Sequence, residues 1–258
     1  MRIEFVSSPK NPKIKDLVSL QEKSSMRRET GLFVVEGRRE IEHALESGYK
    51  IDTLFYCPEL GGIQHPADKL IEVPAAVYEK IAYRGTTEGE IAEFREKIVG
   101  LKDIALGKNP LVVVLESVEK PGNLGAVLRS ADAAGADAVI VCDPLTDLYN
   151  PNLIRASLGA VFTGQVVSTT SEEAVKWLKN KKIQILTAQL QDSEWYYDTD
   201  MKRGTALVIG TESTGLTDIW RNAADAHIKI PMLGSLDSLN ASVSAAILLF
   251  EAVRQRNA

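Results

Sequence analysis

Two hydrophobic patterns alternate along this chain and predict strands and helices in turn. Residues 111–115 form an unbroken apolar run, Leu-Val-Val-Val-Leu, which is typical of a parallel strand buried on both faces. Within residues 37–47, by contrast, Ile41, Ala44 and Leu45 recur at the spacing of one helix face. Because such segments follow one another along the chain, the pattern favours an α/β protein with a parallel sheet.

The same patterns give approximate bounds for most elements. The expected strands are 32–35, 51–56, 69–73, 90–98, 111–115, 138–142, 165–168, 183–187, 206–209 and 226–230. The expected helices are 37–47, 74–83, 122–134, 152–158, 172–179, 215–222 and 239–254. Segment 100–110 breaks the alternation, and single cores usually stop growing near about 250 residues. We therefore expect two domains, at residues 1–107 and 108–258.

Composition excludes several classes of protein. The 258 residues are 45% hydrophobic and 25% charged, which is ordinary for a globular protein and excludes disordered, collagen-like and coiled-coil chains. The longest apolar stretch, 245–250, is far shorter than the roughly 20 residues of a membrane span. The first residues lack the apolar stretch and cleavage site of a signal peptide. We expect a cytoplasmic protein that does not contact a membrane.

Metal binding and disulfides are not expected either. Cys57 and Cys142 each lie in an apolar, strand-like run, and three scattered histidines add no ligand spacing. The sequence therefore predicts buried, reduced thiols and no metal site.

Charge is unevenly distributed. Thirty basic and 35 acidic residues give a net charge of −5, which argues against a large basic face. Residues 8–39 nevertheless carry an excess of positive charge, from Lys10, Lys13, Lys15, Lys23, Arg27, Arg28, Arg38 and Arg39 against Asp16, Glu22, Glu29 and Glu36. This segment is either a solvated helix face or a set of contacts to nucleic-acid phosphates.

The first segment with candidate chemistry is 121–131, Pro-Gly-Asn-Leu-Gly-Ala-Val-Leu-Arg-Ser-Ala. Its glycines allow a ligand to approach the backbone, Asn123 is expected to cap a helix, and Arg129 lies about two turns along it. Because Asp143 ends the next strand, a dinucleotide-binding loop is an alternative, although the G-x-G-x-x-G spacing is missing. Arg129 could instead form a surface pair with Asp132.

A second segment, 207–216, reads Leu-Val-Ile-Gly-Thr-Glu-Ser-Thr-Gly-Leu and predicts a strand, a tight turn and a helix start. Its serine is one position late for a hydrolase elbow, and Asp225 and His227 are too close together to complete a triad, so we exclude a serine hydrolase. Glu212 is either a solvated loop acid or a residue that binds a ligand or fixes the loop.

The third segment, 228–246, predicts a strand that ends at Pro231, a loop, and a helix rich in small residues. A helix N-terminus offers unpaired N–H groups to an anion such as a carboxylate. Ser238 and Asn240 alternatively serve as caps of that helix.

Together and in this order, the three segments resemble the motifs of the SpoU (TrmH) RNA ribose methyltransferases. The matching patterns are Asn-x-Gly-x-x-x-Arg-x-Ala from Asn123, Gly-x-Glu-x-x-Gly-Leu from Gly210, and Ile-Pro-Met from Ile230 with Ser-Leu-Asn-x-Ser from Ser238. Segments 8–15, 27–28 and 33–37 resemble the substrate-binding domain that many members carry, and 152–160 also resembles a family segment. The departures, Ser130, Ser213 and Ala241 in place of threonine, glycine and valine, remove no polar group that the chemistry requires.

The resemblance implies a fold and a reaction. It implies a small N-terminal αβ sandwich of ribosomal-protein type, followed by a parallel-sheet methyltransferase domain with a trefoil knot. It also implies S-adenosylmethionine as methyl donor, a homodimer with the active site near the subunit interface, and methylation of a ribose 2′-hydroxyl. Ribosomal RNA is the favoured substrate and transfer RNA the alternative.

Site residues follow from the same resemblance. For catalysis, Arg129 would favour the developing alkoxide, Asn240 and Ser242 would orient the reactants, Asn123 would brace the site, and Glu212 would hold the cofactor loop. The expected cofactor-binding residues are Gly210, Ile230, Met232, Leu239, Asn240 and Thr187. The expected RNA-binding residues are Lys10, Lys13, Arg27, Arg28, Arg38 and Arg155.

Three other classes of function stay open at this point. They are a nucleotide-dependent oxidoreductase, a catalytically silent RNA-binding relative, and a structural αβ protein that binds neither cofactor nor RNA. Binding of nicotinamide cofactor, or RNA affinity without methyl transfer, would distinguish them.

Overall fold

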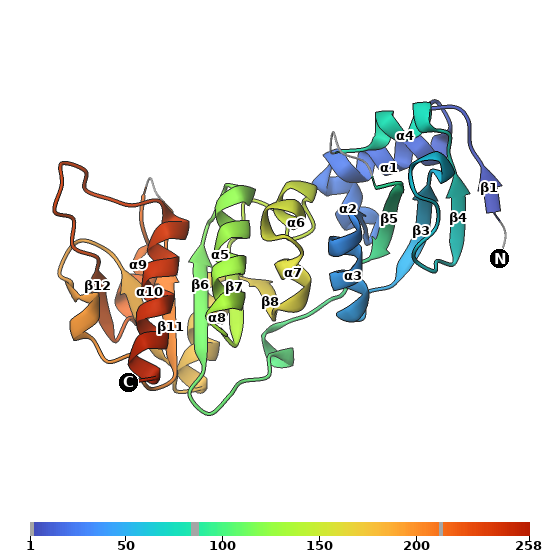
Figure 1. Ribbon diagram of the computed structural model, residues 1–258. Helices are drawn as coiled ribbons and strands as arrows, with labels where there is room; N and C mark the ends of the chain where they lie inside the picture. The colour runs from blue at the N-terminus through green and yellow to red at the C-terminus, as the bar shows by residue number, and fades with distance from the viewer. Residues whose placement is uncertain (1–2, 84–87, 212–213) are drawn as a thin grey trace. The chain divides into compact units, whose positions relative to one another are not determined.

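A computed structural model describes residues 3–83, 88–211 and 214–258. The chain forms two compact units (Figure 1). The N-terminal unit contains Met1–Ile98 and Asp147–Thr163, and the C-terminal unit contains Val99–Thr146 and Gly164–Ala258.

The N-terminal unit is built on a mixed five-stranded sheet. Its strands, β1 (Ile3–Phe5), β2 (Leu32–Glu36), β3 (Ile51–Tyr56), β4 (Lys69–Glu72) and β5 (Glu90–Arg95), are arranged in the order β1-β4-β3-β5-β2. Strand β5 is antiparallel to β2 and β3, whereas β4 is parallel to β1 and β3. The helices are α1 (Pro12–Glu22), α2 (Ser24–Thr30), α3 (Arg38–Glu46) and α4 (Ala75–Ile81), with a 3-10 turn at Pro58–Leu60.

Helix α1 shows why the basic N-terminal segment folds. The Asn11 side chain accepts a hydrogen bond from Lys13 N, and Pro12 occupies the first turn, where its missing N–H costs nothing. Ile14 and Leu17, three residues apart, are buried in the core of the unit. The side chains of Lys13 and Lys15 on the same helix are exposed.

The segment 147–163 joins the N-terminal unit through aromatic packing. It contains α6 (Pro151–Ser157) and α7 (Ala160–Thr163). The Phe33 ring stacks on Tyr149, with centroids 4.2 Å apart, and lies 5.9 Å from the Phe162 ring. A division of the chain at 107/108 assigns this segment to the second domain, whereas its packing places it in the first compact unit.

The C-terminal unit contains a seven-stranded sheet in which every strand pair is parallel. Its strands are β6 (Leu111–Glu116), β7 (Ala138–Cys142), β8 (Val166–Thr169), β9 (Gln184–Ala188), β10 (Glu194–Trp195), β11 (Thr205–Ile209) and β12 (Ala226–Lys229), in the order β10-β12-β9-β11-β6-β7-β8. The expected combination of a small N-terminal sheet and a C-terminal parallel sheet is therefore confirmed.

Helices cover both faces of this sheet. They are α5 (Pro121–Ala133), α8 (Ser171–Asn180), α9 (Asp218–Ala223) and α10 (Ala241–Arg256), with 3-10 turns at Leu101–Asp103 and Tyr196–Asp198. Leu178 of α8 and Trp220 of α9 belong to the core on one face. Helices α5 and α10 pack against each other, and Figure 1 shows them in front of the sheet.

Cys57 and Cys142 are free and buried, as expected. Burial raises the pKa of the Cys142 thiol, and the neighbouring carboxylates of Asp143 and Glu116 raise it further. Among the described residues, no helix is long and apolar enough to span a membrane. The same part of the chain contains no cluster of three or more histidine, cysteine or acidic side chains suited to a metal ion.

Candidate active site

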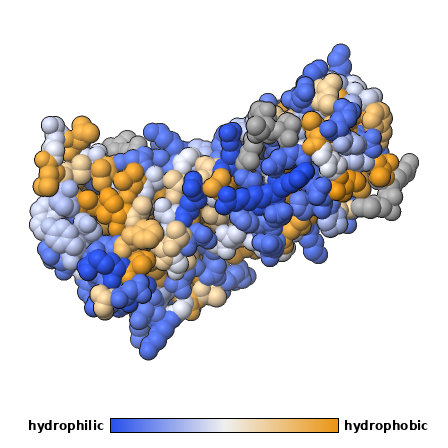
Figure 2. Space-filling model, in the orientation of Figure 1, coloured by the Kyte–Doolittle hydropathy of each residue, from blue (hydrophilic) through white to orange (hydrophobic). Residues whose placement is uncertain are grey.

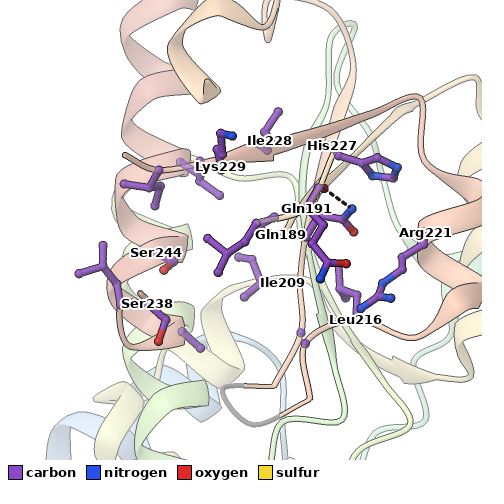
Figure 3. A pocket seen from close by; sticks show the side chains of 18 of the residues that line it. Gln189, Gln191, Ile209, Leu216, Arg221, His227, Ile228, Lys229, Ser238 and Ser244 are labelled. Atoms are coloured by element: carbon purple, nitrogen blue, oxygen red, sulfur yellow. Dashed lines mark hydrogen bonds between the residues drawn. The ribbon is translucent and has the colours of Figure 1, made fainter. Parts of the chain in front are cut away.

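A pocket of about 520 Å³ lies at the carboxyl ends of β9, β11 and β12 (Figure 3). Its walls come from the segments after β9 and β11, from the end of β12, from the following loop, and from the first turns of α10. Ligands of open parallel sheets bind beyond the carboxyl ends of the strands, and this volume is typical of a small-molecule site.

The pocket brings together much of the predicted cofactor-binding set. Its lining includes Gly210, Ile230, Met232 and Leu239. Thr187 and Asn240 are not among the lining residues. Thr187 is fully buried, and its Oγ1 lies 2.6 Å from Nδ1 of His227, which does line the pocket. Thr187 therefore contacts a residue of the pocket wall and does not line the pocket itself.

The turn after β11 requires glycine because two backbone segments meet there. A Cβ atom on Gly210 would lie 2.4 Å from the carbonyl carbon of Gly215 and 2.7 Å from Leu216 N. Gly215 itself has φ of +67°, in the left-handed region. The pocket wall at this point is therefore bare backbone. The predicted Glu212 lies in this turn, outside the described residues.

A buried carboxylate fixes the far end of the same turn. Glu116, at the end of β6, accepts hydrogen bonds from Thr217 N at 2.8 Å and from Thr217 Oγ1 at 2.6 Å. Ser171 Oγ lies 3.2 Å from the Glu116 carboxylate, donates to Asp143 Oδ2 at 2.6 Å, and accepts a hydrogen bond from Trp220 Nε1 at 3.0 Å. Because Glu116 and Trp220 are buried, this network holds the turn and α9 against β6.

A second cluster links the start of α5 to the start of α10. Asn240 Nδ2 donates to Asn123 Oδ1 at 3.1 Å. Asn240 Oδ1 accepts from Ser242 N at 3.0 Å and from Ser242 Oγ at 2.6 Å. Asn240 is the N-cap of α10, so one side chain both starts this helix and contacts α5. Three of the predicted catalytic residues are therefore in one hydrogen-bonded group.

The expected capping role of Asn123 is wrong. The N-cap of α5 is Lys120, and Pro121 begins the helix, so Asn123 lies within the first turn. Its side-chain oxygen is used for Asn240 instead.

Arg129 lies further along α5 and is exposed. Six residues after Asn123, it is displaced by about 9 Å along the helix axis. Arg129 is not among the residues that line the pocket. Its catalytic role stays a prediction.

Four of the six predicted RNA-binding residues present exposed side chains in the N-terminal unit: Lys10, Lys13, Arg28 and Arg155. Lys13 forms an ion pair with Glu4. Arg38 is half-buried at the start of α3, where its main-chain N donates to Glu88 at 2.6 Å.

Arg27 has a structural role that differs from the predicted one. Its guanidinium is buried, pairs with Asp147 at 2.6 Å, and donates to the main-chain oxygens of Leu20 and Gln21. These partners accept the hydrogen bonds of the guanidinium N–H groups that would otherwise bind a phosphate. Arg27 therefore ties α2 to the 147–163 segment and α1, and does not present its charge to RNA.

Comparison with known families decides between the remaining functional classes. The SpoU rRNA Methylase family matches residues 110–250, and the MRM3-like substrate binding domain matches residues 11–92. The chain belongs to the SpoU rRNA methylase family. The resemblance drawn from the three motifs is thereby confirmed.

The chain matches two related proteins over almost their entire length. The chain is 29% identical to the 23S rRNA (guanosine(2553)-2'-O)-methyltransferase RlmP of Bacillus subtilis, covering 95% of this chain and 97% of that protein. It is 31% identical to a 23S rRNA (uridine(2479)-2'-O)-methyltransferase of Streptomyces viridochromogenes, covering 96% of this chain and 91% of that protein.

Solved SpoU structures share the whole fold. AviRb from Streptomyces viridochromogenes in complex with AdoMet matches with a TM-score of 0.89 and 28% identity, over 96% of this chain and 99% of that one. An AdoMet-bound rRNA methyltransferase from Sinorhizobium meliloti matches with a TM-score of 0.88 and 32% identity, over 98% of each chain.

Sequence reasoning missed three residues of this SpoU-type site. Glu116 ends an apolar strand, and a charged side chain at that position was a sequence signal that could have identified it. Gln189 and His227 line the pocket but belong to no motif with a known spacing. Their part in the site depends on β9 and β12 being neighbours in the sheet.

Proposed function

We propose that this protein is an S-adenosylmethionine-dependent methyltransferase that acts on a ribose 2′-hydroxyl of ribosomal RNA. The observation that carries this proposal is the convergence of the family motifs on one place in the fold. Gly210 and Ile230 line a single pocket at the strand ends, and Asn240 immediately precedes the pocket-lining Ala241. The sequence does not contain the G-x-G-x-x-G pattern expected of the alternative function, a nucleotide-dependent oxidoreductase.

The pocket fits the proposed methyl donor. Ile209, Leu216 and Ile228 offer apolar surface for a flat base, and the side-chain-free wall at Gly210 permits close approach to main-chain groups. Asp237 and Ser238, both exposed, provide polar groups at the wall formed by the loop before α10. A nucleoside joined to a charged amino acid requires this combination of surfaces.

In the mechanism, the chain must activate a weak nucleophile. The bound donor supplies an electrophilic methyl group on a sulfonium centre. A ribose hydroxyl must give up its proton, which would pass to water, as it attacks. A nearby positive charge that stabilises the developing alkoxide therefore lowers the barrier. We assign this role to Arg129, whose guanidinium would act by its positive charge or by anchoring the target phosphate. Asn240, Ser242 and Asn123 would orient the reactants, and Glu212 would hold the donor loop.

Support for ribosomal RNA comes from the substrate-binding domain and from the relatives. Both relatives described above are named as 23S rRNA methyltransferases and match this chain over both of its units. Lys10, Lys13, Arg28 and Arg155 would supply phosphate contacts on the N-terminal unit. Because ribosomal RNA is the proposed substrate, we also infer a cytoplasmic location.

We further propose a homodimer in which α10 contributes to the interface. Val243 and Phe250, two turns apart on α10, are each nearly half exposed, at 47% and 48%. Figure 2 shows hydrophobic surface over this helix. Such a patch favours a symmetric contact with a second copy. The trefoil knot expected for the C-terminal unit stays a prediction.

A transfer assay tests the proposed function. The protein is incubated with methyl-labelled S-adenosylmethionine and ribosomal RNA lacking the modification, and the RNA is then hydrolysed with alkali. A ribose 2′-methyl group blocks alkaline cleavage, so we expect the label in alkali-resistant dinucleotides. Label in mononucleotides would indicate base methylation and contradict the proposal. RNA binding without any transfer would support the catalytically silent alternative.

A further inference from the structure

One buried polar atom in the pocket has no hydrogen-bonding partner in the described part of the chain. Gln189 Nε2 donates to the main-chain oxygen of Gln191 at 3.0 Å, the bond drawn as a dashed line in Figure 3. The other amide atom, Gln189 Oε1, is buried and accepts no hydrogen bond from the described residues. Because a main-chain carbonyl can only accept, this bond fixes the amide orientation. The unpaired atom is therefore an acceptor.

Apolar side chains form part of the wall of this pocket. Ile209, Leu216 and Ile228 line the same pocket, and all three are buried. An acceptor without a partner in such a place costs free energy, which a ligand with a matching N–H or O–H group would recover. A ligand donor that reaches Gln189 Oε1 would therefore make a hydrogen bond that the described residues leave unmade.

The proposed methyl donor carries three kinds of hydrogen-bond donor: the adenine amine, the ribose hydroxyls and the amino group of its methionine part. Asp192 and Asp237, both exposed and both lining the pocket, are charged acceptors suited to the hydroxyls and the amino group. A neutral acceptor in a pocket with partly apolar walls is suited instead to the edge of a flat base.

Resting on the proposed function, we propose that Gln189 Oε1 accepts a hydrogen bond from the exocyclic amine of the donor's adenine and so makes the pocket selective for 6-aminopurines. Gln189 is then a specificity-determining residue for the donor. It has no part in the methyl-transfer step itself.

Calorimetric binding of two ligands tests this assignment. The first is S-adenosylhomocysteine, and the second is its 6-deamino analogue, which lacks the amine and adds no new group. The wild-type protein should bind the analogue about 10- to 100-fold more weakly, because the buried acceptor loses its partner. In Gln189→Met, which keeps the length of the side chain and removes the acceptor, this preference should fall below about threefold, through weaker binding of S-adenosylhomocysteine.

Gln64→Met is the matched control. Gln64 is an exposed residue of the N-terminal unit that does not line the pocket, and its Nε2 also donates to a main-chain oxygen, that of Gly61. This variant should keep the wild-type preference. Thermal unfolding of both variants establishes that they are folded.

Three results would overturn the assignment. The first is an equal affinity of the wild type for the two ligands, a result that does not depend on any variant folding. The second is an unchanged preference in Gln189→Met. The third concerns 5′-methylthioadenosine, which keeps the adenine but lacks the amino-acid part. If Gln189→Met binds S-adenosylhomocysteine more weakly than the wild type does but binds 5′-methylthioadenosine equally well, Gln189 Oε1 accepts from the amino group and not from the adenine. If the wild type binds neither S-adenosylmethionine nor S-adenosylhomocysteine, the proposed function fails instead.

Discussion

At the scale of single residues, the burial and pairing of each guanidinium determine which arginines can contact a ligand. Arg27 and Arg129 are both arginines in helices, yet Arg27 is buried in an ion pair with Asp147, whereas Arg129 is exposed on α5. An exposed guanidinium can meet a phosphate or an alkoxide, and a paired one cannot without breaking its existing bonds. The exposure of Arg129 is compatible with the role in the reaction that we propose for it, whereas the contacts of Arg27 give that residue a role in folding.

Arg129→Ala should therefore lower turnover strongly while the protein stays folded. We expect a loss of about 100- to 1,000-fold in kcat, since one electrostatic contact to the transition state is removed. The dissociation constant of S-adenosylmethionine should change by less than about threefold, because Arg129 does not line the pocket. Single-turnover kinetics and calorimetry measure the two quantities. Lys176→Ala, an exposed site on α8, is the control, and normal turnover in Arg129→Ala would remove Arg129 from the mechanism.

Residue roles were only partly predictable from the sequence. The motif glycines and Asn240 could be found because family spacing marks them. The contact between Asn123 and Asn240 joins positions 117 residues apart, so no local pattern contains it. Arg27 could not be separated from Arg28 by charge. Its burial follows from the packing of α2 and the distant 147–163 segment.

At the scale of elements, strands buried on both faces were predicted most accurately. The expected bounds of β3 and β7 agree with the structure at both ends. The apolar run of β7 is continuous, whereas β3 contains Asp52 and Thr53 between its apolar residues. The three-residue β1 and the two-residue β10 are too short to show a period, and both were missed. The antiparallel position of β5 between β2 and β3 is set by long-range pairing that hydrophobic periodicity does not encode.

The turn after β11 gives a prediction for one element of the site. Gly210→Ala would force a Cβ atom against the main chain of Gly215, so the turn must move. We expect a loss of about 1–3 kcal/mol in the free energy of unfolding and weaker binding of S-adenosylmethionine. Gly234→Ala is the matched control, because nothing lies within 4 Å of the added atom. Equal behaviour of the two variants in denaturant titration and calorimetry would show that the close approach is unimportant.

Strand β5 gives a prediction about pH. Burial raises the pKa of Glu93 to about 7, Thr53 lowers it, and the nearby Asp52 carboxylate raises it further. The folded protein therefore binds a proton more tightly than the unfolded chain, whose carboxyl has a pKa near 4.5. The contribution of Glu93 to the free energy of unfolding is therefore fully present below pH 4.5 and is lost as pH rises through about 7.

Glu93→Gln should remove that dependence. The wild type should lose about 2–3 kcal/mol between pH 4.5 and 8 relative to Glu93→Gln, as an upper value from the shift in pKa. Urea unfolding across this range measures the difference. Glu42→Gln, at an exposed position, should keep the wild-type profile. Parallel profiles for wild type and Glu93→Gln would contradict the assignment.

At the scale of the whole molecule, we propose different tasks for the two units, RNA binding and methyl transfer. The net charge of −5 conceals this division, because the candidate phosphate contacts are confined to the N-terminal unit. The two-unit organisation was visible in the sequence from the break in alternation. The return of 147–163 to the first unit was not, because its helices continue the α/β pattern without interruption.

Charge reversal tests the RNA-binding unit. Lys10→Glu combined with Arg28→Glu should weaken RNA binding and reduce the slope of log affinity against log salt by about one for each phosphate that the wild-type side chain neutralises. Binding of S-adenosylmethionine should not change. Filter binding at several salt concentrations measures the slope. The reversal of two exposed lysines on α8, Lys176→Glu with Lys179→Glu, controls for net charge. An unchanged slope would mean that the basic segment is only a solvated face.

The central claim, methyl transfer to a ribosomal RNA ribose, is tested most directly by mapping the modified nucleotide. Total RNA from a strain lacking the gene is incubated with the protein and labelled S-adenosylmethionine, and new ribose methyl groups are located at nucleotide resolution. We expect one labelled 2′-hydroxyl in ribosomal RNA, absent without the protein and strongly reduced with Arg129→Ala. Label confined to transfer RNA or to a base, or no label in either free RNA or assembling ribosomal particles, would contradict this claim.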